Sequence, residues 1–182
     1  MADAIPFPRT RSGTGGPLGT LELSWELFGE LCRGLALRVV QGYEPELVIG
    51  IATAGVLPAA TVAAMLQIDF ESMRITRREG GILHPRPAVL SAAPARARGR
   101  RVLLVDEIAT SGDTMRLALA SVRDAGPAEV RTATSFIRPG GYRPDFWALE
   151  SDQLIVFPWD REVIEAGERV VPPIYSGPLL ED

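Results

Sequence analysis

The sequence is poor in the residues that build disulfide frameworks and zinc centres. Its 182 residues include one cysteine and one histidine. A single cysteine excludes an intramolecular disulfide, and one cysteine and one histidine are too few to supply the ligands of a Cys/His zinc cluster. Cys32 falls within a helical pattern, which predicts a small core residue in a reducing compartment.

Basic charge and long apolar runs are also scarce. The formal net charge is −4, which argues against general nucleic-acid binding because such binding needs a basic surface. Residues 47–68 lack charge over about the length of a membrane span, but Gly50, Gly55 and Pro58 favour a strand, a turn and a helix. The N-terminus lacks the apolar stretch of a signal peptide. We therefore expect a cytoplasmic protein without membrane contact.

The remaining pattern predicts a single α/β domain over 21–182, preceded by an irregular arm at 1–20 that is rich in Pro, Gly, Ser and Thr. Apolar runs predict buried strands, and a 3.6-residue period predicts helices. The expected strands cover 46–52, 69–76, 100–106, 129–137 and 154–158. The expected helices cover 24–41, 56–67 and 113–126, and residues 78–99 are expected to form a loop or a ragged hairpin. Buried strands that alternate with helices indicate a parallel sheet wrapped by helices.

The stretch VLLVDEIATSGDT (102–114) leads an apolar strand into two acids, Asp106 and Glu107, and then into a loop of small and hydroxyl residues. Ligands of open α/β sheets bind at the carboxyl ends of the strands. The amides of Thr110–Thr114 open a helix there and suit an anion, to which Ser111 and Thr114 can add hydroxyl donors. The two carboxylates suit vicinal hydroxyls or the outer shell of a magnesium ion. Together these features indicate a ribose 5-phosphate.

Plainer interpretations of this stretch exist. Acids after a strand can form a solvated loop beside a capped helix, and each feature alone is common. A nucleoside-triphosphatase loop is excluded, because neither GIATAG (50–55) nor ATSGDT (109–114) is followed by the Lys-Ser/Thr pair that such loops require. GTGGPLG (13–19) has no preceding strand and does not match the dinucleotide-binding spacing.

The same stretch resembles the phosphoribosyl-pyrophosphate (PRPP) loop of type I phosphoribosyltransferases. That loop follows an apolar strand and two acids, and it ends in Thr-Gly-x-Thr; Glu107 and Ser111 are conservative replacements. VIGIATAGVLPAA (48–60) is similar to the pyrophosphate loop of the family. LIVFPWD and VVPPIYSG look like the base-covering hood and tail of xanthine-guanine phosphoribosyltransferases, at 154–160 and 170–177.

This resemblance implies a type I phosphoribosyltransferase fold with a small C-terminal hood at about 138–178. It implies magnesium-dependent transfer of ribose 5-phosphate from PRPP to a nucleobase, with a purine favoured. The resemblance implies that Asp106 and Glu107 are catalytic groups at the ribose, and that Glu107 also reaches magnesium through ribose or water. The residues implied at the 5-phosphate are Ala109, Thr110, Ser111, Gly112, Asp113 and Thr114, and those implied at pyrophosphate are Thr53, Ala54 and Gly55. The residues implied at the base are Arg138, Leu154, Ile155 and Asp160. Family members usually pair, so a homodimer is implied.

Three residues depart from the family pattern. Thr53 and Ala54 replace the usual Arg-Gly of the pyrophosphate loop, and the Cβ of Ala54 restricts a backbone that glycine leaves free. Thr110 stands where 6-oxopurine enzymes carry an aspartate, and a threonine cannot act as a general base near neutrality. Orotate-type members carry a hydroxyl residue there, so transfer is not excluded, but purine specificity is in doubt.

These departures keep a second hypothesis open, a non-catalytic module that senses PRPP or a nucleotide with the same pocket. A hydrolytic use of the pocket has no nucleophile or metal cluster behind it. Segment 74–99 matches the mobile loop of the family, where Arg77, Arg78 and Arg86 either meet pyrophosphate or face solvent. Trp159 is expected to be a core residue beneath the hood rather than the residue that stacks on the base.

Overall fold

The computed structural model of the chain describes residues 19–79 and 82–172. The chain divides into two compact units: residues 31–151, here called the sheet unit, and residues 1–30 with 152–182, here called the small unit. Most of the arm expected at 1–20, and the tail after residue 172, lie outside the described residues.

A six-stranded sheet forms the centre of the sheet unit, with the strand order β4-β3-β2-β5-β6-β7. All neighbours are parallel except β3 and β4, which form an antiparallel hairpin. The strands are β2 (Leu47–Ala52), β3 (Asp69–Glu79), β4 (Ile82–Val89), β5 (Arg101–Ala109), β6 (Glu129–Ile137) and β7 (Phe146–Glu150). The α/β class and the mostly parallel sheet predicted from the sequence are confirmed.

Two strand predictions need correction. β5 does not end at Asp106 but continues to Ala109, because Asp106, Ile108 and Ala109 keep their register with β6. The edge strand β7 was not predicted, since FWALE lacks both the alternation of a half-buried strand and the long apolar run of a central one. The expected hairpin at 78–99 is formed by β3 and β4, followed by a short 3-10 helix at Ala95–Ala97.

In the described part of the chain, three α-helices occupy the segments predicted for them. α1 (Trp25–Val40) begins after Ser24, whose Oγ accepts a hydrogen bond from the Leu27 amide at 3.2 Å, as expected of an N-cap. α2 (Val56–Leu66) begins after Gly55 and carries no charged residue. α3 (Asp113–Asp124) begins after Gly112. Within residues 19–79 and 82–172, no helix has the length and apolarity needed to cross a bilayer.

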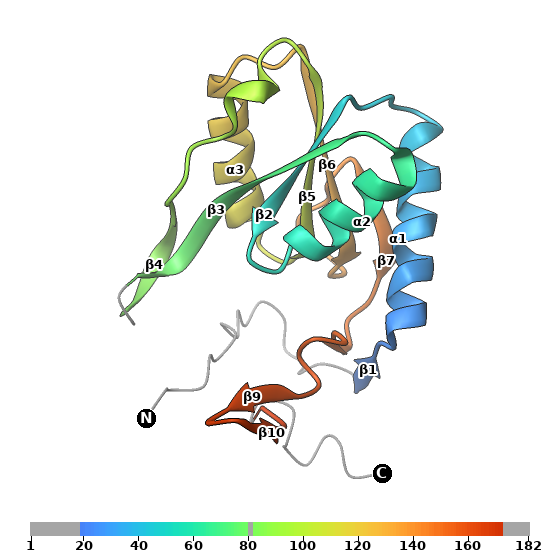
Figure 1. The fold of residues 1–182 in the computed structure, drawn as a ribbon, viewed down its shortest axis with the longest axis vertical. Helices are drawn as coiled ribbons and strands as arrows, with labels where there is room; N and C mark the ends of the chain where they lie inside the picture. Colours follow the sequence, from blue (N-terminus) through green and yellow to red (C-terminus); the bar gives the residue numbers. More distant parts are fainter. Residues whose placement is uncertain (1–18, 80–81, 173–182) are drawn as a thin grey trace. The chain divides into compact units, whose positions relative to one another are not determined.

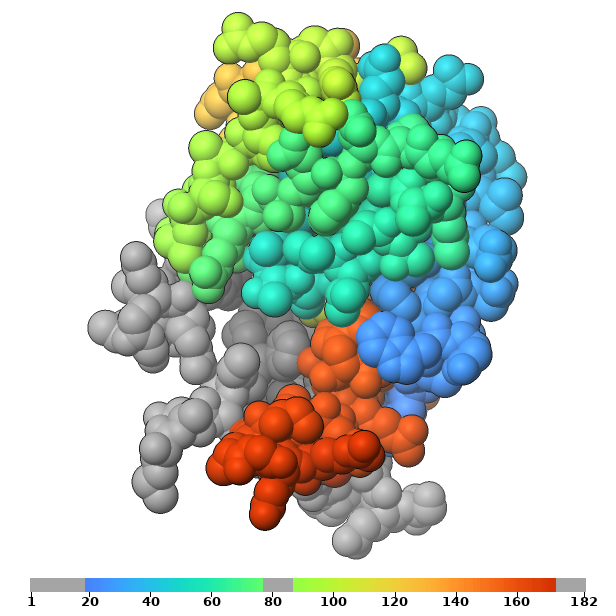
Figure 2. Space-filling model, in the orientation of Figure 1, coloured from blue at the N-terminus to red at the C-terminus, as the bar shows by residue number. Residues whose placement is uncertain are grey.

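Helices cover both faces of the sheet, with α3 on one side and α2 on the other (Figure 1). On the α3 side, Met115 and Ala118 belong to one buried cluster with Leu104 of β5. Cys32 on α1 is completely buried, which confirms its expected place in the core. The outer surface of α2 lies beside β3 on the face seen in Figure 2. The core thus fixes the central strands whose ends carry the predicted site.

The small unit is held by a short parallel pair and an aromatic cluster. β1 (Thr20–Glu22) pairs in parallel with β8 (Leu154–Val156), and β9 (Val163–Glu165) forms a hairpin with β10 (Glu168–Val170). The Trp159 ring stacks on Phe157, with centroids 4.7 Å apart, and meets the edge of Phe28 at 5.1 Å. Trp159 therefore packs against the aromatic side chains of this unit but is half-buried rather than the core residue that was expected.

Candidate active site

Two loops that are about fifty residues apart in the sequence meet at the carboxyl ends of β2 and β5. These strands are parallel neighbours, with Gly50 opposite Val105. The backbone of Gly55 lies directly against Asp106: a Cβ at this position would come within 2.8 Å of Asp106 Oδ1 and 2.7 Å of the Ile51 carbonyl oxygen. Only a glycine lets the two loops approach so closely. The structure thus joins the predicted pyrophosphate loop (Thr53–Gly55) to Asp106, the first of the two acids.

The two acids lie within β5, near its end, rather than beyond it. Asp106 is half-buried, and its Oδ1 accepts a hydrogen bond from the Glu107 amide at 2.9 Å. Burial raises the pKa of the Asp106 carboxyl to about 7, and the hydrogen bond from the Glu107 amide opposes this rise. Glu107 is buried, with 6% of its surface exposed. An acid that titrates near neutrality at the end of a central strand is typical of a functional site.

The loop Ala109–Thr114, here called the phosphate loop, connects β5 to the first turn of α3. Gly112 adopts the left-handed conformation, with a φ of 80°, and so turns the chain into the helix. The Ser111 hydroxyl donates to Asp113 Oδ2 at 3.0 Å, while the loop ends at helix amides that have no acceptor within the helix. Such amides, together with the helix dipole, suit a phosphate group.

The segment that follows β6 folds onto the phosphate loop, which the sequence did not predict. The Tyr142 amide donates to the Thr110 carbonyl oxygen at 2.9 Å, and the Arg138 amide donates to the Ala109 carbonyl oxygen at 3.3 Å. Arg138, expected at the base, therefore lies beside the phosphate loop. No sequence signal marked Tyr142, because a tyrosine in a Gly/Pro-rich loop is ordinary.

The other residues expected at the base belong to the small unit. On β8, Leu154 is half-buried and Ile155 is buried, with 5% of its surface exposed. Asp160 is half-buried, and its amide donates to the Phe157 carbonyl oxygen at 3.0 Å. Their role at a base stays a prediction. The side chains of Arg77, Arg78 and Arg86 lie outside the described residues.

The loop predicted to bind pyrophosphate is a tight turn that leads into α2. The peptide bond between Ala52 and Thr53 is cis. The amides of Val56 and Leu57 donate to the carbonyl oxygens of Thr53 and Ala54, at 3.2 and 3.3 Å. The Thr53 side chain is exposed and that of Ala54 is half-buried, so the loop offers backbone rather than charged side chains to a ligand.

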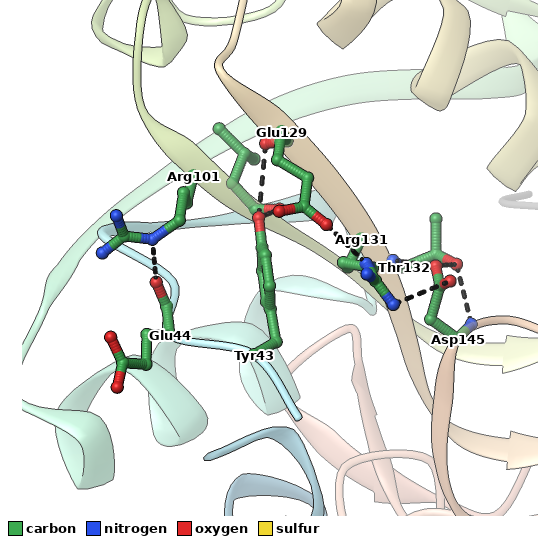
Figure 3. Close-up of polar contacts among 8 residues, drawn as sticks. Tyr43, Glu44, Arg101, Glu129, Arg131, Thr132 and Asp145 are labelled. Carbon is green, nitrogen blue, oxygen red and sulfur yellow. Dashed lines mark hydrogen bonds and ion pairs between the residues drawn. The ribbon is translucent and has the colours of Figure 1, made fainter. Parts of the chain in front are cut away.

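The opposite, amino-terminal edge of the sheet carries a dense set of polar contacts (Figure 3). The Tyr43 hydroxyl lies 3.0 Å from the Val102 carbonyl oxygen and 3.3 Å from that of Glu129. Arg131 pairs with the Glu129 carboxylate at 2.7 Å. These groups bind one another and so tie the strands together at this edge.

The described residues contain no group of three or more His, Cys, Asp and Glu side chains that could enclose a metal ion. Near the carboxyl edge, Asp106 and Glu107 are neighbours in the sequence on β5, so their side chains leave opposite faces of the strand, with Asp106 half-buried and Glu107 buried. Magnesium commonly takes one or two carboxylates and completes its shell with water and substrate phosphates. One carboxylate at this edge, such as that of Asp106 beside Gly55, therefore fits a magnesium ion that arrives with a phosphorylated ligand.

Comparison with known proteins decides the family. The family described as phosphoribosyl transferase domain matches residues 23–168. The chain belongs to the phosphoribosyltransferase family. It is 32% identical over 155 residues to the xanthine-guanine phosphoribosyltransferase of Nitratidesulfovibrio vulgaris strain Hildenborough, and the match covers 82% of this chain and 88% of that protein. The predicted membership and transferase class are confirmed.

Solved phosphoribosyltransferases share the fold. The purine phosphoribosyltransferase of Pyrococcus horikoshii aligns with a TM-score of 0.69 and 24% identity, covering 81% of this chain and 99% of that one. The xanthine-guanine-hypoxanthine phosphoribosyltransferase of Helicobacter pylori aligns with a TM-score of 0.61 and 19% identity, covering 76% and 91%. At these identities the similarity establishes the type I phosphoribosyltransferase fold, and the ligand has to be inferred from the chemistry of the site.

Proposed function

We propose that this phosphoribosyltransferase moves the ribose 5-phosphate group of PRPP to a purine base. The bond between the anomeric carbon and pyrophosphate breaks, a bond from that carbon to a ring nitrogen of the base forms, and the proton of that nitrogen passes to solvent. The observation that carries this proposal is the close approach of Gly55 to Asp106, which joins a turn suited to pyrophosphate to an acid suited to a ribose.

The phosphate loop is proposed to bind the 5-phosphate. Its residues are Ala109, Thr110, Ser111, Gly112, Asp113 and Thr114. The amides at the start of α3 point along the helix axis toward the incoming chain, so they and the helix dipole favour an anion. The hydroxyls of Ser111 and Thr114 can add two donors. Thr53, Ala54 and Gly55 would receive the pyrophosphate through backbone amides.

Asp106 and Glu107 are proposed to hold the ribose between these two loops. As carboxylates, they accept hydrogen bonds from its vicinal hydroxyls. They also favour the positive charge that develops at the anomeric carbon as pyrophosphate departs. The Asp106 carboxyl, with its pKa raised to about 7, supplies its full negative charge only above neutral pH.

Magnesium fits this arrangement as the partner of PRPP. When bound, it would supply Lewis-acid neutralisation of the leaving pyrophosphate. Glu107 would hold it, through the ribose hydroxyls or a water molecule, and the remaining ligands would be oxygens of PRPP and water. The protein's own part is to orient the ribose and to keep two carboxylates beside it.

A purine is proposed as the acceptor because the curated relative is named a xanthine-guanine phosphoribosyltransferase. Arg138 follows β6 at the same edge as the phosphate loop and can donate to an exocyclic oxygen of the base. Leu154, Ile155 and Asp160 are proposed as the wall and the amino-edge acceptor of the base. We further propose that residues 21–182 act as one domain and that two copies pair, which light scattering of the purified protein would test.

A second candidate, a sensor of PRPP or a nucleotide, is favoured by two observations. The exposed Thr110 provides no general base, and Thr53 brings no cation to the pyrophosphate loop. Such a protein would bind the same ligands without turnover.

The deciding experiment measures pyrophosphate release from PRPP and magnesium in the presence of guanine, xanthine, hypoxanthine, adenine, uracil or orotate. We expect release with at least one 6-oxopurine. Release only with a pyrimidine would overturn the purine assignment, and binding of PRPP without release with any base would favour the sensor.

A further inference from the structure

The phosphate loop is held from outside by three residues, Arg116, Gly141 and Tyr142, here called the loop clamp. Gly141 and Tyr142 lie in the segment after β6, and Arg116 lies on the first turn of α3. None of the three was singled out by the sequence. Each contacts a part of the loop that the proposed function assigns to the 5-phosphate.

The first contact fixes Thr110. Its carbonyl oxygen accepts the Tyr142 amide at 2.9 Å. Gly141 packs so closely that a Cβ there would come within 2.7 Å of the same oxygen. The carbonyl is therefore turned toward the segment after β6, which leaves the other side of this peptide for a ligand.

The second contact fixes Gly112. The Tyr142 ring lies against its backbone, and a Cβ at Gly112 would come within 2.4 to 2.6 Å of Tyr142 Cγ, Cδ2 and Cβ. Tyr142 is half-buried and also packs against the core on the α3 side. The left-handed turn of Gly112 is thus pressed between the ring and the start of the helix.

The third contact fixes Ser111. The Arg116 guanidinium donates to the Ser111 carbonyl oxygen at 2.9 Å and to Asp113 Oδ1 at 3.3 Å. It also lies 5.1 Å from the centre of the Tyr142 ring, within the range of a cation–π contact. The side chain joins the loop, the helix and the ring into one network.

We propose that Arg116 and Tyr142 are positioning residues that hold the phosphate loop ready for the 5-phosphate before PRPP binds. Three consecutive loop peptides, at Thr110, Ser111 and Gly112, are each held by a clamp contact. A loop ordered in advance loses less conformational entropy on binding. The clamp touches the phosphate loop, so its effect falls on the phosphoribosyl end of the ligand. This inference rests on the proposed function.

The test uses Tyr142→Ala, Tyr142→Phe and Arg116→Ala in the full chain, titrated by calorimetry with ribose 5-phosphate and, separately, with magnesium pyrophosphate. Tyr142→Ala and Arg116→Ala are expected to weaken ribose 5-phosphate binding about tenfold and to raise the KM of PRPP similarly. Pyrophosphate affinity and the KM of the base are expected to stay within about twofold. Tyr142→Phe keeps the ring and is expected to restore wild-type binding.

Arg143→Ala is the matched control. Arg143 lies over the Trp147 ring at 5.3 Å and pairs with Glu150 at 3.0 Å, so its loss removes the same kinds of contact one residue away from the clamp. We expect unchanged ribose 5-phosphate binding. Should Tyr142→Ala fail to fold, the exposed Arg116→Ala still provides the test, because its side chain lies on the surface of α3.

Two results would overturn the inference. Equal losses for ribose 5-phosphate and pyrophosphate would mean that the clamp supports the fold in general. Unchanged ribose 5-phosphate binding in Arg116→Ala and Tyr142→Ala, in a protein whose wild type turns over PRPP, would mean that the loop needs no clamp. A wild type that binds neither PRPP nor ribose 5-phosphate would instead overturn the proposed function, and the clamp with it.

Discussion

Acidic side chains occur at both ends of the six-stranded sheet, but their surroundings differ. At the amino end, Glu129 pairs with Arg131 at 2.7 Å, and Glu46 lies 3.8 Å from Arg101. At the carboxyl end, burial rather than a nearby cation sets the pKa of Asp106, and the bare backbone of Gly55 lies against its carboxylate. One end therefore pairs its charges with one another, whereas the other holds a half-buried acid against the backbone of a turn.

Glycines show the same contrast. Gly112 and Gly126 both have a left-handed backbone, with φ values of 80° and 77°. A Cβ at Gly112 would strike the Tyr142 ring, whereas a Cβ at Gly126, just before β6, would meet nothing within 4 Å. Gly126 thus serves a turn alone, whereas Gly112 also lets the Tyr142 side chain pack against its backbone.

The largest effect is therefore expected from alanine at these two glycines. Gly112→Ala displaces the phosphate loop and should lower kcat/KM for PRPP about a hundredfold. Gly126→Ala introduces only the strain of a left-handed φ, which should lower the free energy of unfolding by about 1 kcal/mol and leave kcat/KM unchanged. Steady-state kinetics and thermal melts of both variants check this pair. Equal losses of activity would remove the distinction between the two ends.

The second prediction concerns the pH dependence of activity. Because the free protein's Asp106 carboxyl has a pKa of about 7, it gains a proton as the pH falls through neutrality and loses its charge. We expect kcat/KM for PRPP to fall below pH 7 with a slope approaching about tenfold per pH unit. Asp106→Asn should lower kcat/KM at pH 8 and flatten this part of the profile. An unchanged profile in Asp106→Asn would assign the titration to another group or to PRPP.

Stability should change in opposite directions for aspartates at the two ends. The folded pKa of Asp106 exceeds its usual 3.8, so the folded state loses stability as pH rises from about 4 to about 7. Asp106→Asn removes this cost and should raise the unfolding free energy at pH 8, by up to about 4 kcal/mol for a pKa raised from 3.8 to about 7, and by little at pH 4.

Asp145 is the comparison at the amino end. Its Oδ2 accepts hydrogen bonds from the Thr132 amide and hydroxyl, both at 2.8 Å (Figure 3). Asp145→Asn weakens these charge-assisted bonds and should lower the unfolding free energy by about 1 kcal/mol. Urea denaturation at the two pH values measures both variants, and a loss of stability in both would contradict the proposed difference.

The smallest effect is expected at the exposed ion pairs of the amino end. Arg101→Ala removes the pair with Glu46, and such exposed pairs contribute less than about 1 kcal/mol. We expect a small fall in the melting temperature and no change in kcat/KM. A large loss of PRPP turnover in this variant would show that the amino end takes part in function.

The sequence carried enough information for the fold class and for one end of the site. The buried runs of β2 and β5 and the turn residues between them marked the central strands, because burial on both faces leaves a continuous apolar pattern. The VLLVDEIATSGDT stretch also placed the acids and the phosphate loop next to each other in the chain.

What the sequence could not supply depends on contacts between distant segments. The approach of Gly55 to Asp106 follows from the register of β2 and β5, which no local pattern specifies. Tyr142 stands in a loop whose composition predicts only a turn, and its packing on Gly112 exists only once β6 lies beside β5. The edge strand β7 was also missed, because the short stretch FWALE shows neither the alternation of a half-buried strand nor a long apolar run.

The most direct test of the account is a calorimetric titration of PRPP, with magnesium present, into the wild type and two double variants. Asp106→Asn with Glu107→Gln removes two charged acceptors at the carboxyl end, and Glu46→Gln with Glu129→Gln does the same at the amino end. We predict binding at least about tenfold weaker in the first and unchanged in the second. Wild-type affinity in the first variant would contradict the assignment of the ribose to these acids.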